Sequence, residues 1–166
     1  RDLVRSRGLG DVYKRQTLGQ GKDTDFFLSM HVHKVYGFEI QKDVFENTRN
    51  RFLNARTCFY NVGHEYMEEY VHEVVDAIIF NFGYFPSGSH EITTQSLSSV
   101  MAVKQALHLL KVKGRMALVM YPHESGVKEA KCIEDFLKSQ TGIQVQKVQN
   151  LLVDYCPYLL LIEKRR

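Results

Sequence analysis

Two short stretches near the start of the chain combine residue types that bind nucleotide cofactors. Residues 17–24 read TLGQGKDT, in which Gly19 and Gly21 precede a predicted helix. The next predicted strand, over residues 34–40, carries Glu39 at its end. Glycines let a backbone approach a ligand closely, and a carboxylate at a strand end can accept hydrogen bonds from two ribose hydroxyls. Together they predict a nucleotide-cofactor site at the edge of a Rossmann-like sheet.

The residues around these glycines favour S-adenosylmethionine (SAM) over NAD. The third glycine of the dinucleotide fingerprint is absent, and Asp23 stands where that fingerprint continues. An acidic side chain near the loop, where Gln20 also lies, can hold the ammonium group of SAM. Two alternatives stay open: Glu39 could be a plain surface acid, and Gln41 either contacts the adenosine or begins the next helix.

A second pair of candidates follows the strand predicted over residues 56–61. Gly63 and His64 would lie beside the adenine ring if this strand ends at the same edge of the sheet. The alternative is that His64 is an exposed residue at the N-terminus of the helix predicted over residues 65–72.

The stretch with the most reactive composition is residues 76–88, DAIIFNFGYFPSG. An apolar strand predicted over residues 74–80 leads into Asn81, Tyr84 and a Pro/Gly loop at the carboxyl edge, where ligands bind in such sheets. The arrangement resembles the Asn-Pro-Pro-Tyr loop of amino-group methyltransferases, whose Asn accepts a hydrogen bond from the target amine while the aromatic ring stacks on the base. The two prolines are absent here, and a purely structural loop is the alternative.

Tyr121 ends the next predicted strand at the same edge and could line a substrate pocket. His123 or Glu124, which follow it, could help a substrate ammonium to lose its proton before attack. Neither residue needs to be a strong base for such a reaction.

Strand and helix signals alternate along the rest of the chain. Helices are predicted over residues 23–30, 43–54, 65–72, 94–110 and 126–139, and strands over residues 34–40, 56–61, 74–80, 115–121, 143–149 and 158–163. Alternating βα units predict an α/β fold, with a mainly parallel sheet and helices on both faces. The last two strands are expected to pair antiparallel, which is typical of the class I methyltransferase sheet.

Residues 1–16 do not share this pattern. They are rich in arginine and glycine, have no apolar period, and end in DVYKRQ, which resembles a translated transposon sequencing adapter. We therefore expect a non-native segment followed by one methyltransferase domain over residues 17–166; a natural basic arm is the alternative. Sheets of this kind have a strand that runs into the glycine loop, so we expect the domain to lack its native first strand.

The same segment accounts for the basic balance of the chain. The formal net charge is +3, and residues 1–16 hold all of it. Charge therefore gives no support to nucleic-acid binding.

Composition sets further bounds. The length from residue 17 onward fits a single domain, and no apolar run reaches the roughly 18 residues that a membrane span needs. Cys58, Cys132 and Cys156 are odd in number and lack CxxC spacing. This pattern predicts reduced thiols in a cytoplasmic protein, with no disulfide framework and no metal site.

Taken together, the motifs resemble the YtqB/MnmM family of class I SAM-dependent methyltransferases. The resemblance rests on TLGQGKDT from residue 17, VYGFEIQ from 35, GHE from 63, FNFGYFPSG from 80, ITT from 92 and PYLLLIEK from 157. It implies methylation of the aminomethyl group of 5-aminomethyl-2-thiouridine at the tRNA wobble position. It also implies a SAM site and substrate-facing residues. The SAM site would comprise Gly19, Gln20, Gly21, Asp23, Glu39, Gln41, Gly63 and His64, and the substrate side Asn81, Tyr84 and Tyr121.

The chain departs from the family pattern at four places, of which the first is the absence of the Asp-x that should precede Thr17. Glu39 stands where Asp is usual, Gly63 replaces a usual Ser, and Tyr-Pro-His-Glu-Ser-Gly from Tyr121 replaces Tyr-Pro-Gly-His-x-Gly-Gly. The alternatives are an rRNA or small-molecule methyltransferase, an NAD-dependent oxidoreductase, and an inactive fragment or binding module. A homodimer is a further possibility, and no membrane partner is implied.

Overall fold

The computed structural model describes residues 12–15, 21–53, 56–82, 92–122, 124–154 and 156–166. Its strands are β1 Val12–Arg15, β2 Lys34–Phe38, β3 Thr57–Tyr60, β4 Val75–Phe82, β5 Leu110–Met120, β6 Ile143–Val148 and β7 Tyr158–Lys164. Its helices are α1 Lys22–Ser29, α2 Lys42–Arg51, α3 Met67–Tyr70, α4 Ile92–Leu109 and α5 Glu124–Ser139, and a 3-10 turn, η1 His64–Tyr66, precedes α3.

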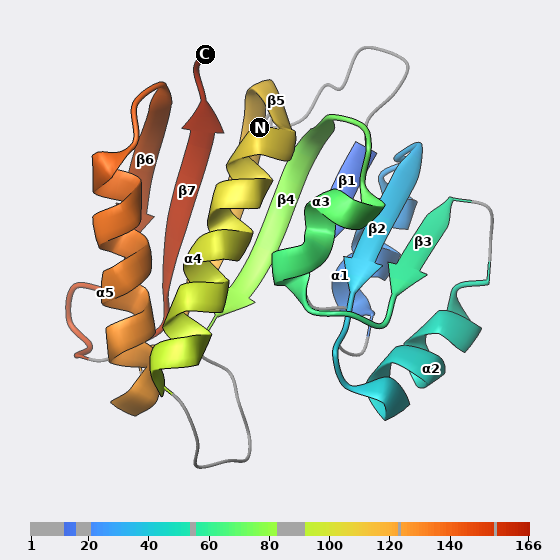
Figure 1. The fold of residues 1–166 in the computed structure, drawn as a ribbon, viewed down its shortest axis with the longest axis horizontal. Helices are drawn as coiled ribbons and strands as arrows, with labels where there is room; N and C mark the ends of the chain where they lie inside the picture. Colours follow the sequence, from blue (N-terminus) through green and yellow to red (C-terminus); the bar gives the residue numbers. More distant parts are fainter. Residues whose placement is uncertain (1–11, 16–20, 54–55, 83–91, 123, 155) are drawn as a thin grey trace.

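The strands form one seven-stranded sheet in the order β3-β2-β1-β4-β5-β7-β6. Strands β1 to β5 pair in parallel, whereas β7 runs antiparallel to both β5 and β6. Figure 1 shows α3, α4 and α5 on one face of the sheet and α1 on the other. The predicted α/β architecture, including its antiparallel C-terminal pair, is confirmed.

The largest difference among the predicted elements concerns β5. The strand begins at Leu110, directly after α4, and not at Arg115. Its pairing with β4 is irregular there, because Val75 pairs with Leu110 while Ala77 pairs with Arg115. Lys113 accordingly has a φ of 67°. The intervening residues form an irregularity that a periodicity argument does not reveal.

The centre of the sheet is occupied by β1, which comes from the segment that we expected to lie outside the fold. Val12–Arg15 pair in parallel with β2 on one side and with β4 on the other. A strand therefore fills the position that we expected to be empty. The foreign origin of residues 1–16 stays a prediction, because strand pairing uses backbone groups that every non-proline residue carries.

Two separate clusters of buried residues hold the layers together. The larger cluster lies between the sheet and α3, α4 and α5, and includes Phe80 and Leu118. The smaller one consists of Phe27, Val32 and Val35, against which Leu28 and Ile79 pack. Side chains alternate along β4, so that Ile78, Phe80 and Phe82 enter the larger core while Ile79 faces the smaller one.

Candidate functional site

The carboxyl ends of the parallel strands meet at the lower edge of the sheet in Figure 1. Gly21 follows β1, Glu39 follows β2 and Gly63 follows β3. Asn81 is the second-last residue of β4, and Tyr121 follows β5. Ligands of open α/β sheets bind outside this edge. The fold thus brings sequence-predicted residues from five separate segments to one side of the molecule.

Gly21 makes a sharp entry into α1. It is the N-cap residue, with a φ of 77°, a left-handed conformation that strains any residue with a side chain. A Cβ atom there would lie 2.4 Å from Cε2 of Phe52, at the end of α2. Asp23 lies in the first turn of α1, beside the positive end of the helix dipole. Gly19 and Gln20, predicted on the same loop, lie outside the described residues.

Glu39 is buried at the end of β2, with only 8% of its surface exposed. Its Oε1 accepts a hydrogen bond of 3.0 Å from the backbone N–H of Gln41. Asn61, after β3, donates through Nδ2 to the Glu39 carbonyl at 2.6 Å and to the Ile40 carbonyl at 3.2 Å. These bonds fix the turn that carries the carboxylate, so Glu39 is not a plain surface acid.

Gln41 and Asn61 also take part in this turn. Gln41 is the N-cap of α2 and its side chain is exposed, so the structure has it beginning the next helix; contact with an adenosine stays a prediction. Asn61 is a positioning residue that sequence reasoning missed. An Asn after a strand is an ordinary turn residue, and only the fold places it against Glu39.

His64 begins η1 and packs against the end of β4. Its ring lies edge-on to Phe80 and to Phe82, with centroid distances of 6.3 Å and 6.0 Å. Gly63, before it, is buried. The structure therefore does not have the exposed His64 of the alternative interpretation, and it places this turn beside the strand that carries Asn81.

Asn81 and Tyr121 end neighbouring strands. The backbone N–H of Tyr121 donates to the Phe82 carbonyl at 3.1 Å, which extends the β4–β5 pairing past the strand ends. Asn81 lies opposite Val119 and, by alternation, on the face of β4 that carries Ile79. Tyr84 and His123, which were predicted near them, lie outside the described residues.

The larger of two described grooves, about 680 Å³, lies beside this edge between α5 and the connection from β6 to β7. It includes Pro122, next to Tyr121, and a polar cluster that sequence reasoning missed. In that cluster, Glu134 Oε1 accepts hydrogen bonds from the Tyr158 hydroxyl at 2.8 Å and from Lys147 Nζ at 3.0 Å. Burial disfavours the carboxylate, but these two bonds outweigh it and lower the pKa of Glu134.

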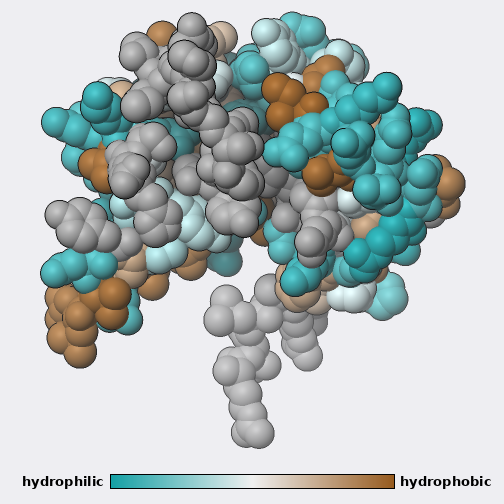
Figure 2. Space-filling view, turned by 90° about the horizontal axis from the view of Figure 1, so that it is seen from below, coloured by the Kyte–Doolittle hydropathy of each residue, from teal (hydrophilic) through white to brown (hydrophobic). Residues whose placement is uncertain are grey.

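The same end of the molecule also exposes apolar side chains. Leu151 and Leu152, in the connection from β6 to β7, are 94% and 91% exposed. Figure 2, which looks onto this edge, shows an apolar cluster projecting from the end formed by β6 and β7, and mostly hydrophilic residues at the opposite end.

A second groove, of about 490 Å³, lies between the end of α2 and β3 and includes Phe52 and Tyr60. None of the predicted site residues that the structure describes lines either groove. The candidate site is therefore defined by convergence of strand ends and not by a closed cavity among the described residues.

Two features are absent from the described ranges of the chain. No three His, Cys, Asp or Glu side chains gather there in a way that could hold a metal ion. Likewise, no helix within those ranges has the length and apolar character needed to cross a membrane.

Comparisons with known proteins agree with this arrangement. Residues 35–163 match the family described as "Putative rRNA methylase". The chain is 33% identical, over 94% of its length, to the chloroplastic tRNA (mnm(5)s(2)U34)-methyltransferase of Arabidopsis thaliana. It spans 64% of the length of that relative.

Solved structures give the same result for the fold. A protein named as a putative rRNA methylase from Clostridium thermocellum superposes with a TM-score of 0.83 at 33% identity, covering 93% of this chain and 89% of its own. A protein named as a putative methyltransferase from Streptococcus mutans, in complex with S-adenosylhomocysteine (SAH), gives a TM-score of 0.80 at 32% identity with the same coverage. The Rossmann-like class I methyltransferase fold is thereby confirmed, and the chain belongs to the rRNA-methylase family that the YtqB/MnmM motifs indicated.

Proposed function

We propose that this protein is a SAM-dependent N-methyltransferase that acts on tRNA. The observation that carries the proposal is the convergence of Gly21, Glu39, His64, Asn81 and Tyr121 on one sheet edge in a chain with the methyltransferase fold. The cofactor side of the edge is formed by the segments after β1, β2 and β3. The substrate side is formed by the ends of β4 and β5.

The donor set on the cofactor side fits SAM. Glu39 offers a carboxylate that is already oriented by the Gln41 amide and by Asn61, and it would accept hydrogen bonds from the ribose hydroxyls. Asp23, at the start of α1, would hold the ammonium group of the cofactor. Gly63 and His64 would border the adenine ring.

SAM supplies an electrophilic methyl group on a sulfonium centre. When bound, it would give that methyl group to a neutral amine nitrogen of the substrate and leave as SAH. Asn81 would accept a hydrogen bond from the amine and aim its lone pair, and Tyr84 and Tyr121 would hold the base. Such catalysis consists mainly of positioning and needs no strong base.

The finer part of the proposal concerns the methyl acceptor. We assign it as the aminomethyl group of 5-aminomethyl-(2-thio)uridine at the tRNA wobble position. Support comes from the Arabidopsis relative, whose name specifies the modification mnm(5)s(2)U34, and from an Asn at the end of β4 that suits an amine. A cytoplasmic location and a homodimer stay predictions; the relative is named chloroplastic.

Methyl transfer to defined RNAs tests the assignment. Purified protein would be incubated with methyl-labelled SAM and with tRNA that carries wobble 5-aminomethyl-2-thiouridine, the same tRNA without the aminomethyl group, or rRNA. Nucleoside mass spectrometry would locate the label. We expect one methyl group on the wobble nucleoside of the first RNA only, and loss of that product in Asn81→Ala while SAH binding persists.

Each other outcome selects an alternative. Label in rRNA, or in a free amine but in neither tRNA, would replace the acceptor and keep the enzyme class. Binding of NAD in place of SAM would support the oxidoreductase. Binding of neither cofactor would support the non-catalytic fragment.

A further inference from the structure

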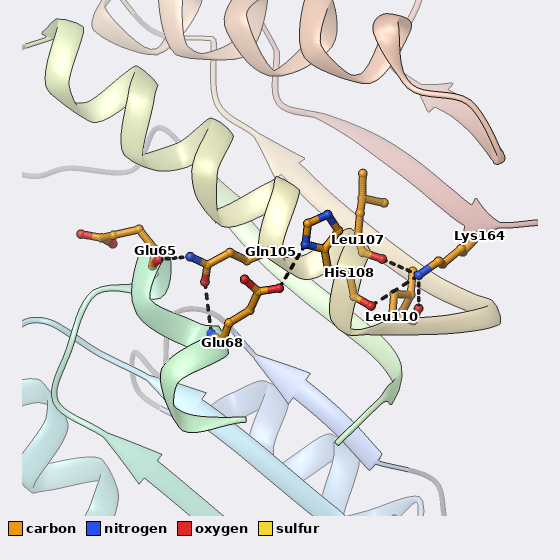
Figure 3. Close-up of polar contacts among 7 residues, drawn as sticks. All are labelled: Glu65, Glu68, Gln105, Leu107, His108, Leu110 and Lys164. Atoms are coloured by element: carbon orange, nitrogen blue, oxygen red, sulfur yellow. Dashed lines mark hydrogen bonds and ion pairs between the residues drawn. The ribbon is translucent and has the colours of Figure 1, made fainter. Parts of the chain in front are cut away.

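One amide side chain of helix α4, that of Gln105, hydrogen-bonds the segment that follows Gly63 and His64. Gln105 Nε2 donates to the Glu65 carbonyl at 2.5 Å, and the Glu68 backbone N–H donates to Gln105 Oε1 at 3.1 Å (Figure 3). One side chain thus satisfies a carbonyl in η1 and an amide in the first turn of α3. The two partners lie about forty residues away in sequence.

The turn needs such support because its own structure is short. Turn η1 has three residues and α3 has four, and neither has a side-chain hydrogen bond at its N-cap. Helices of this length are marginal by themselves, and their first amides have no partner within the helix. Gln105 supplies that partner from another element.

Helix α4 is itself held in place by β7 and by the larger core. At its C-terminal end, Lys164 of β7 donates through Nζ to the carbonyls of Leu107 at 2.7 Å and Leu110 at 2.8 Å (Figure 3). Ala102, Val103 and Ala106 on α4 are fully buried in the larger core. The position of α4, and with it that of Gln105, is therefore fixed by the sheet.

The turn is held from a second side by β4. The His64 ring lies edge-on to Phe80 and Phe82, both fully or almost fully buried. Ring contacts of this kind tolerate small shifts between the turn and β4. The two hydrogen bonds of Gln105 are directional and therefore restrict the position of the turn more closely. Gln105 is thus one of the contacts that set the position of the backbone of residues 65–68 relative to α4.

We propose that Gln105 is a positioning residue for the adenosine end of the cofactor, acting through the Gly63–His64 turn. The proposal rests on the cofactor placement proposed above. It predicts that loss of the amide weakens every ligand that carries the adenosine group, by the same factor, whatever the other end of the ligand contains.

The chain offers a matched control on the same face of α4. His108, one helical turn later, contacts the Glu68 carboxylate through Nδ1 at 3.2 Å, and its side chain is 63% exposed. It also links α4 to α3, but it contacts the flexible Glu68 side chain and not a backbone group. His108→Ala should therefore leave ligand affinity within about twofold, as expected for an exposed pair.

The test compares two ligands by calorimetry, at a temperature well below the melting point of each variant. SAH carries both ends of the cofactor, and 5′-methylthioadenosine lacks the amino acid. We expect Gln105→Met to weaken both ligands by a similar factor, roughly five- to tenfold, as expected for two neutral hydrogen bonds. Gln105→Glu, which sets a carboxylate against the Glu65 carbonyl in place of the donor, should weaken both ligands at least as much. Asp23→Asn should weaken SAH alone.

The outcomes separate this proposal from the cofactor assignment. Wild-type affinity in Gln105→Met, or an equal loss in His108→Ala, would overturn the positioning role while leaving SAM binding intact. A loss for SAH without a loss for methylthioadenosine would also overturn it. Failure of the wild-type protein to bind either ligand would overturn the cofactor assignment, and the positioning role with it.

Discussion

The two halves of the sheet are built differently. Strands β4 to β7 share one extensive core with α3, α4 and α5, in which Phe80 and Leu118 are completely buried. Strands β2 and β3 lie on the other side of β1, and the described core on the α1 face is the small cluster of Phe27, Val32 and Val35. The larger core also includes Tyr36 and Phe38 of β2, but the cofactor half contributes fewer buried residues to it than the substrate half does.

Strand β1 connects the two halves of the sheet. In the strand order β3-β2-β1-β4, the pair β2–β3 reaches the rest of the sheet through β1. The four residues Val12–Arg15 therefore join the cofactor half to the substrate half by backbone pairing. We therefore expect the stability of the cofactor half to change when β1 is disrupted, when the local backbone is strained or when a ligand binds.

We expect the largest effect from removing a buried aromatic ring from the larger core cluster. Phe80→Ala should lower the free energy of unfolding by about 3–5 kcal/mol, because a fully buried ring leaves a cavity. The matched change Phe27→Ala, at a side chain 4% exposed in the smaller cluster, should cost clearly less. Urea unfolding monitored by circular dichroism measures both. Equal costs would contradict the unequal cores.

We expect the second-largest loss of stability from disrupting the backbone pairing of β1. Lys14→Pro removes a backbone N–H from a strand that is paired on both sides, with Tyr36 in β2 and Ile78 in β4 as its register partners. We expect a loss of about 1–3 kcal/mol, the cost of one unsatisfied buried backbone group. Hydrogen exchange should rise in β2 and β3 and stay unchanged in β7.

Unchanged exchange in β2 and β3 would show that these strands do not need β1. A second version of the chain, with residues 1–16 replaced by the corresponding strand of the Clostridium thermocellum relative, is the control. If residues 1–16 are foreign, that version should be more stable and bind SAH more tightly.

A smaller effect comes from two glycines that share a left-handed conformation. Gly21 has a φ of 77° and Gly142 a φ of 75°. Gly142→Ala should cost about 1–2 kcal/mol, and Gly21→Ala should cost more, because its Cβ would also meet the Phe52 ring. Only Gly21→Ala should also weaken SAH, because Gly142 precedes β6, away from the candidate site. Paired melting and calorimetry measure this, and weakened SAH binding in both variants would remove the distinction.

The smallest effect is a pH dependence of opposite sign in the two halves. Hydrogen bonds from Tyr36 and Lys34 lower the pKa of Glu73, before β4. Burial raises the pKa of Glu129, on α5, although Ser99 donates to it. A lowered pKa in the folded state stabilises above the ordinary value of about 4.3 and loses that stability as the pH falls. A raised pKa gives stability at low pH that is lost as the pH rises.

Glu73→Gln should therefore reduce stability at neutral pH and flatten the acid side of the stability curve. Glu129→Gln should increase stability at neutral pH. The Glu73 side chain is 43% exposed, so solvent screening keeps its effect to at most about 1 kcal/mol. Unfolding midpoints between about pH 4 and 7 measure both, and a shift of the same sign in both variants would contradict the assignment.

The sequence predicted much of this arrangement. The alternation of apolar periods placed eleven helices and strands, because each period follows from the geometry of one element. It also placed Glu39, Gly63, Asn81 and Tyr121 at strand ends, and in a parallel sheet strand ends share an edge. The irregular start of β5 was missed because a bulge depends on the partner strand and not on the local pattern.

The fold class, the cofactor motif and the family could thus be predicted from the amino-acid sequence alone. Only the tertiary structure decided that residues 12–15 fill the centre of the sheet, that Asn61 holds the Glu39 turn, and that Gln105 clamps the backbone after His64. The reason is physical. Apolar periodicity and glycine spacing are properties of neighbouring residues, whereas a hydrogen bond between a side chain and a distant backbone group leaves no local pattern, and strand pairing uses groups that nearly all residues share.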